Sequence, residues 1–388
     1  MNILRENLER HMHELCLQIG SRHCGSAGEA AAADYIESVF KNMGMDVVRE
    51  EYPVRGWDFR SFELWNVTQN RAVPSATACY FSNRINVEGP LLRIKAAEIN
   101  KLEQLPLKGR LCFVEFWSGM DGVMGRNKIA EELDRLGAVG AIFISNIHTD
   151  LAPSTKIERS PFLKKLGVAA VSQNGAFDLA RNLDDIYRLK IDAEGFDHRS
   201  CNVIARLEGK TGADKGVFGC HYDTAPLIQG AGDNATGTAM LLELTRLLKD
   251  NSSTWSLDFC AFSAEEYIPE KFPPGSENYV QRHGHENIRW FFNLDNFGLL
   301  VADPVIQIGH RDKLPALTLP YEAITAKQSG DDKTFFHAGI PTIWFSDRQP
   351  FHILHTKEDS IDKIDFNKME EGVGHILATF RQLTEEKK

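Results

Sequence analysis

Six short motifs, separated along the chain, carry acidic and imidazole side chains that could bind metal ions. They are His221-Tyr222-Asp223, Asp233-Asn234, Glu265-Glu266, Asn293-Leu294-Asp295, Asp331-Asp332 and His355-Thr356. Together they offer two imidazoles and three carboxylates as ligands for two metal ions, a donor set that suits zinc. A further carboxylate remains to act as a base. The combination predicts metal-dependent chemistry at one site.

Each motif also has a simpler structural explanation. His221 and Asp223 could belong to a turn after a strand, and Asp233 could cap a helix. Adjacent glutamates such as Glu265 and Glu266 often lie on a solvated face. The metal site is favoured because the motifs occur together and in order at the ends of consecutive predicted strands.

The second half of the chain alternates between apolar strands and amphipathic helices, which is typical of a mostly parallel α/β sheet. The expected strands are 217–220, 256–262, 290–294 and 341–345, and the expected helices are 234–248, 276–282, 333–337 and 366–383. Ligand sites of open α/β sheets lie beyond the carboxyl ends of the strands. His221, Glu265 and Asp295 should meet there. Asp223 lies two residues after His221 and should orient its imidazole.

The first 200 residues divide into two parts. Helices are expected at 4–19 and, from a Ser26-x-x-Glu29 capping box, at 26–40, with strands at 46–54 and 62–67. The expected elements between residues 72 and 200 are strands 109–116, 138–145, 167–172 and 187–191 and helices 125–136 and 174–183. None of the six motifs falls in this stretch. We therefore expect residues 72–200 to form an inserted domain, and residues 1–71 and 201–388 to form the catalytic domain.

Composition limits the possible partners. The 388 residues carry a formal net charge of -10 and no cluster of basic residues stands out, which argues against nucleic acid. No apolar run approaches the roughly 20 residues of a membrane span. The N-terminus shows no signal-peptide pattern, and the seven cysteines include no CxxC pair, as expected for reduced thiols. We expect a cytoplasmic enzyme with a peptide substrate, and the oligomeric state stays open.

Several of these motifs resemble a known family, the co-catalytic di-zinc aminopeptidases, to which glutamate carboxypeptidases and glutaminyl cyclases are related. The matching strings are Gly219-Cys220-His221-Tyr222-Asp223, Gly232-Asp233-Asn234-Ala235-Thr236-Gly237, Ser263-Ala264-Glu265-Glu266, Gly275-Ser276, Asn293-Leu294-Asp295 and His355-Thr356. The resemblance covers nearly the whole chain, and residues 72–200 look like the family's inserted protease-associated domain. It implies a three-layer α/β, phosphorylase/hydrolase-like zinc exopeptidase domain with a mostly parallel central sheet, plus a smaller inserted α/β domain.

The resemblance also implies a role for each site residue. His221 and Asp295 would bind one zinc ion, Glu266 and His355 the other, and Asp233 would bridge the two; Glu265 would be the general base and Asp223 a second catalytic residue. The implied reaction is hydrolysis of N-terminal residues from peptides by a zinc-bridged water. Two alternatives stay open: a glutaminyl-peptide cyclotransferase with one zinc, and a carboxypeptidase or dipeptidase of the same family.

The chain departs from the family pattern at two places. Residues Tyr267–Pro274 replace a short Gly-Leu type link and are expected to reshape the substrate pocket. Asp332 stands where the family frequently has histidine, which puts the role of that histidine in doubt. The expected contacts of a substrate amine are Glu265, Asp295 and Asp331. A substrate carboxylate would instead need a cation, and the available ones are Arg282, Arg289, Arg311 and Lys333.

Overall fold

The structure, a computed structural model, describes residues 3–116, 125–145, 150, 163, 165–210, 214–250, 255–267, 272–350 and 353–384. The chain forms two compact units. The first consists of Met1–Arg55, Asp197–Leu354 and Glu358–Lys388, and the second of Gly56–Phe196 with His355–Lys357. Two long strands, β1 (Asp46–Asn66) and β8 (Ile186–Leu207), have residues in both units.

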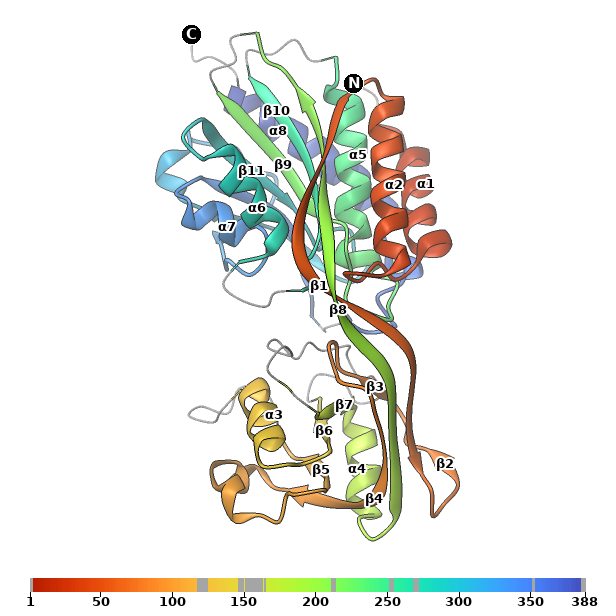
Figure 1. The fold of residues 1–388 in the computed structure, drawn as a ribbon. Coiled ribbons are helices and arrows are strands. Elements are labelled where there is room, and N and C mark those ends of the chain that lie inside the picture. Colours follow the sequence, from red (N-terminus) through yellow and green to blue (C-terminus); the bar gives the residue numbers. More distant parts are fainter. Residues whose placement is uncertain are drawn as a thin grey trace. The chain divides into compact units, whose positions relative to one another are not determined.

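The first unit contains a twisted, mostly parallel sheet (Figure 1). Its strands follow the order β13 (Glu322–Thr325), β12 (Asp303–Gly309), β14 (Thr342–Arg348), β11 (Ile288–Leu294), β9 (Lys215–His221), β10 (Ser256–Phe262) and β8. Strands β14, β11, β9 and β10 run parallel to one another. Strand β12 is antiparallel to β14, and β8 is antiparallel to β10. This confirms the expected α/β class with a mostly parallel central sheet.

Helices pack on both faces of this sheet (Figure 1). They are α1 (Arg5–His13), continued by a π-helical segment Glu14–Ile19, α2 (Ala27–Asn42), α5 (Thr236–Leu248), α6 (Pro274–His283), α7 (Asp332–His337) and α8 (Phe366–Thr384), with 3₁₀ turns Arg311–Lys313 and Ile361–Lys363. Phe218 of β9 lies in the core with α1, α2, α5 and α8, whereas its neighbour Val217 lies in the core with α6 and α7. Burial on both faces explains why these strands read as continuous apolar runs.

The second unit is also α/β. Its strands follow the order β4 (Ile85–Ile94), β5 (Leu111–Val114), β6 (Gly140–Ile144), β7 (Gly167–Val171) and β3 (Ala76–Ala78), and β2 (Arg71–Ala72) pairs with β1. The helical segments are α3 (Arg126–Arg135), α4 (Gln173–Arg181) and a 3₁₀ segment Ala96–Gln104. No helix in the described ranges of either unit is both long and apolar enough to cross a membrane.

The two predicted strands 46–54 and 62–67 are one continuous strand, so that prediction was wrong. A Cβ on Gly56 would lie 2.5 Å from the ring of Phe196, so a glycine at this position lets β1 run on past that aromatic ring. The strand predicted at 187–191 likewise extends through β8. Strands β4, β12 and β13 were not predicted at all. Because β1 and β8 pass from one unit into the other without a turn, no turn signal in the sequence marks the boundaries at Gly56 and Phe196.

Candidate metal centre

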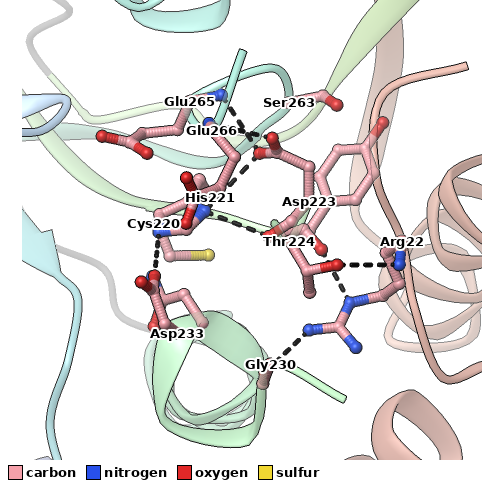
Figure 2. Close-up of polar contacts among 12 residues, drawn as sticks. Arg22, Cys220, His221, Asp223, Thr224, Gly230, Asp233, Ser263, Glu265 and Glu266 are labelled. Atoms are coloured by element: carbon pink, nitrogen blue, oxygen red, sulfur yellow. Dashed lines mark hydrogen bonds and ion pairs between the residues drawn. The ribbon is translucent and has the colours of Figure 1, made fainter. Parts of the chain in front are cut away.

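The first group of predicted ligands gathers at the carboxyl ends of two adjacent parallel strands. His221 is the last residue of β9, and Asp295 follows the last residue of β11. Asp233 comes from the short helical turn Ala231–Ala235 that precedes α5. The His221 Nε2 atom lies 3.0 Å from Asp233 Oδ1 (Figure 2). The same atom lies 3.3 Å from Asp295 Oδ1. These three side chains therefore converge on one point.

A second group combines Asp233 with Glu266 and His355. One ligand atom from each of these residues lies within 4.8 Å of the others, as is also true of the first group. Asp233 belongs to both groups. The structure thus brings together all five predicted ligands, in the pairing that the sequence suggested, and their binding of metal stays a prediction. His352, the other histidine of this segment, lies outside the described residues.

The donor set fits a divalent cation. Asp233, Glu266 and Asp295 are all buried, and burying several carboxylates at close range is unfavourable without compensating positive charge. Burial raises the pKa of Asp295, and the negative charges of Asp233 and Glu266 raise it further, although His221 opposes them. Imidazole and carboxylate donors suit zinc, which can take four such ligands at one ion.

His221 is oriented by its other ring nitrogen. Nδ1 lies 3.2 Å from the backbone carbonyl oxygen of Asp223 and 3.5 Å from the Asp223 carboxylate. Both Asp223 oxygens therefore lie beside Nδ1, the main-chain oxygen being the nearer, and the orienting role of Asp223 stays a prediction. Burial lowers the pKa of His221, but the hydrogen bonds to Asp223, Asp233 and Asp295 outweigh burial and raise that pKa well above its usual value.

The carboxylate of Asp223 has a second task that the sequence did not reveal. Its Oδ1 accepts the backbone N–H of Glu265 at 3.1 Å, and its Oδ2 accepts the backbone N–H of Glu266 at 3.0 Å (Figure 2). Ala264, just before them, adopts a left-handed conformation with φ +59°. Asp223 therefore fixes the tight turn on which the predicted base and its neighbouring ligand are carried.

Gly330 brings the backbone close to two of the acidic groups. A Cβ at this position would lie 3.3 Å from Asp295 Oδ2 and 3.5 Å from Glu265 Oε1. Asp332, which replaces the family's frequent histidine, accepts the Gly330 N–H at 3.1 Å and so holds this backbone in place. Burial raises the pKa of Asp331 to about 7 and that of Asp332 to about 6. The backbone at Gly330 thus borders the oxygens of Glu265 and Asp295.

Cys220 does not belong to either group. Its thiol is buried and donates a hydrogen bond to the Thr238 hydroxyl at 3.7 Å, and burial raises its pKa to about 12. All seven cysteines of the chain are free.

Arg22 is fully buried and binds backbone carbonyls. Its guanidinium donates to the carbonyl oxygen of Gly230 at 3.0 Å (Figure 2). It also donates to the carbonyl oxygens of Tyr222 at 2.8 Å and Gln229 at 2.9 Å, and to those of Leu15 and Gly20. Burial lowers its pKa from the usual value. Arg22 thereby links the loop after His221 to the loop before Asp233. The sequence did not indicate this role, because the carbonyls of Tyr222, Gln229 and Gly230 lie about 200 residues away along the chain.

Arg22→Met should lower the free energy of unfolding by about 3 to 5 kcal/mol, because it removes a buried charge and leaves several buried carbonyls without their donor. Urea denaturation followed by tryptophan fluorescence would measure the loss. Arg289→Met is the matched control, since the Arg289 side chain is 51% exposed and forms a surface ion pair with Asp214. Equal urea midpoints for the two variants would contradict the assignment.

Glu29 contacts Ser263, two residues before Glu265. Its buried carboxylate accepts hydrogen bonds from the hydroxyls of Ser200 and Ser263, the latter at 2.6 Å, and from the Gly25 N–H. Burial alone raises the pKa of Glu29, but these hydrogen bonds and that of His198 lower it overall. The predicted capping box is thus only half formed: Ser26 accepts the Glu29 N–H, while the Glu29 side chain turns inward.

Comparisons with known proteins identify similar sequences and structures. Residues 202–380 match the model of Peptidase family M28. The chain is 27% identical to the aminopeptidase YwaD of Bacillus subtilis over 402 residues, covering 97% of this chain and 84% of that protein. It is 26% identical to the probable lipoprotein aminopeptidase LpqL of Mycobacterium tuberculosis over 293 residues, covering 73% of this chain and about half (55%) of that protein.

The fold comparison covers the whole chain. The structure of BSAP, described as a zinc aminopeptidase from Bacillus subtilis, superposes with a TM-score of 0.80 at 21% identity, covering 100% of this chain and 97% of that one. At this identity the likeness shows the fold. The fold similarity and the family match over residues 202–380 are therefore combined. Residues 202–380 of the chain are similar to Peptidase family M28, and the chain shares the fold of a solved zinc aminopeptidase.

Proposed function

We propose that this enzyme is a zinc aminopeptidase that removes N-terminal residues from peptides with the help of two zinc ions. The observation that carries the proposal is the pair of ligand groups that share Asp233, with Glu265 next to Glu266. His221 and Asp295 would hold one ion, and Glu266 and His355 the other. When bound, the ions would polarise the scissile carbonyl and make water a stronger acid.

In this proposal the chain's own groups position the substrate and move the proton. The Glu265 carboxylate would accept a proton from the attacking water and return it to the leaving amine, as a general base and then a general acid. The substrate's free amine would lie near Gly330, beside the oxygens of Glu265 and Asp295. A cationic ammonium group suits this acidic surrounding.

The cations that a carboxypeptidase would need are partly engaged elsewhere. Arg282 donates to the carbonyl oxygen of Glu51 at 2.7 Å, and Arg289 forms its ion pair with Asp214 at 2.5 Å. Lys333 lies 5.9 Å from the centre of the Phe272 ring. These contacts support removal of residues from the N-terminus over removal from the C-terminus. Of the segment Tyr267–Pro274, proposed to shape specificity, residues 268–271 lie outside the described residues.

Metal analysis tests the proposal directly. We expect two tightly bound zinc ions per chain after chelator treatment, readdition of zinc and gel filtration, together with hydrolysis of leucyl and other aminoacyl peptides. The two ligand groups with their shared Asp233 are the reason for that number. A single bound zinc with cyclisation of N-terminal glutamine would favour the cyclotransferase alternative. Absence of zinc binding would overturn the proposal.

A further inference from the structure

The backbone of the loop that carries Asp233 is held by the carboxylate of a distant residue, Asp359. Asp359 is fully buried; its Oδ1 accepts the Gly232 N–H at 2.6 Å and its Oδ2 accepts the Asp233 N–H at 3.1 Å. The backbone carbonyl of Asp359 also accepts the Ala231 N–H at 3.4 Å. One residue therefore binds three successive amides that lead into the residue shared by both ligand groups.

The other end of the same loop is held by positive charge. The Arg22 guanidinium binds the carbonyl oxygens of Gln229 and Gly230, and the Gln229 side chain accepts the Ile361 N–H at 2.8 Å. Gly230 adopts a left-handed conformation with φ +58°, and a Cβ there would lie 2.3 Å from Thr224 Cγ2. The loop 229–233 thus presents its carbonyls to a buried cation and its amides to a buried anion.

In this loop, the backbone of Asp233 and the side chain of Asp233 have different partners. The main chain of Asp233 is fixed by Asp359, which leaves the Asp233 side chain directed at His221, 3.0 Å from its Nε2 atom. Asn234 adds a third restraint, because its side-chain N–H donates to the carbonyl oxygen of Leu294, next to Asp295. A carboxylate whose backbone is already fixed loses little freedom when it binds a cation.

We propose that Asp359 is a positioning residue that holds Asp233 in the conformation that binds both metal ions. The inference rests on the proposed zinc function of the site. Asp359 is expected to act through the backbone of Asp233 and to contact neither the metal nor the substrate. Its removal should weaken zinc binding by about 10- to 100-fold, the range typical of residues that support a metal ligand.

Asp359→Asn tests the proposal, because the amide replaces one acceptor oxygen with a donor that faces a backbone N–H. The zinc dissociation constant of chelator-stripped protein would be measured by competition with a colorimetric chelator. The Tm of the stripped and zinc-saturated protein would be measured alongside. We expect Asp359→Asn to bind zinc 10- to 100-fold more weakly than the unmodified chain. A fixed excess of zinc should also raise the Tm of this variant by less than it raises that of the unmodified chain. A residue with only a structural role would lower the Tm of the stripped protein and leave zinc affinity unchanged.

Asp134→Asn is the matched control. The Asp134 Oδ1 atom accepts two successive backbone amides, those of Lys165 at 3.1 Å and Leu166 at 3.0 Å, within the second unit. This variant loses the same kind of hydrogen bond without touching the loop of Asp233. Its zinc affinity should equal that of the unmodified chain.

The outcomes distinguish this inference from the proposed function. If the unmodified chain binds no zinc, the proposed function and the inference both fall. If it binds zinc tightly and Asp359→Asn binds equally well, only the inference is overturned. Should Asp359→Asn not fold, Gln229→Ala removes the side-chain acceptor of the Ile361 N–H and should weaken zinc binding about fivefold, as expected for one ordinary hydrogen bond. Unchanged affinity in that variant would also overturn the inference.

Discussion

Glu265→Gln should lower kcat by about 10²- to 10⁴-fold, the usual contribution of a general base, while zinc content stays the same. The substitution keeps the size of the side chain and removes only its ability to accept a proton. The backbone N–H that holds the turn to Asp223 is also retained. Steady-state kinetics on an aminoacyl peptide and metal analysis of the same preparation would measure both quantities.

The neighbouring Glu266→Gln variant is the control that separates the two glutamates. Glu266 lies in the second ligand group, so its substitution should weaken zinc binding because an anionic ligand is lost. Activity of this variant should recover, at least in part, as zinc is raised. Near-normal kcat in Glu265→Gln with full zinc content would remove Glu265 from the role of base.

Acetylation of the substrate's N-terminus should lower kcat/KM by about 10⁴-fold. An enzyme whose buried groups bind a polar group of the substrate rejects, by about this factor, a substrate analogue that lacks that polar group. The partners proposed here are the oxygens of Glu265 and Asp295 that border Gly330. The measurement compares one good peptide substrate in its free, N-acetylated and C-terminally amidated forms.

Amidation of the C-terminus should change kcat/KM little, because the cations Arg282 and Arg289 already bind other groups. The reverse pattern, with tolerance of acetylation and loss on amidation, would assign carboxypeptidase action instead. Lys333, beside Phe272, would then be the first residue to substitute.

Four of the five ligands were open to prediction because each follows an apolar strand or lies in a small-residue loop, whereas the role of His355 came from the resemblance of its His-Thr motif to the family. His221 and Asp295 illustrate this: their strands β9 and β11 are adjacent and parallel, so both residues reach the same edge. Burial of the sheet on both faces made those strands easy to recognise. The α/β class followed from the alternation of apolar strands and helices, and helix α2 from its Ser26-x-x-Glu29 capping box.

The residues that hold the ligand-bearing loops in place could not be predicted from the sequence in the same way. Asp359 and Glu29 act through hydrogen bonds to segments more than 100 residues away, and an isolated acidic residue in a loop or a helix has no local pattern that reveals such partners. Strands β12 and β13 were missed at the edge of the sheet. The length of β1 was missed because Gly56 permits a close approach that only the three-dimensional contact explains.

The Arg22 contacts have a consequence for the order of events as the chain is synthesised. During synthesis, the carbonyls that Arg22 binds are added to the chain about 200 residues after Arg22 itself. Asp359 is added more than 100 residues after the amides that it binds. Contacts of such separation form late and slow folding. A ribosome-bound chain that ends before Asp359 would already contain His221, Asp233 and Asp295, yet the loop between them would lack its anchor. The loop of Asp233 is therefore expected to reach its anchored conformation only after Asp359 has been synthesised.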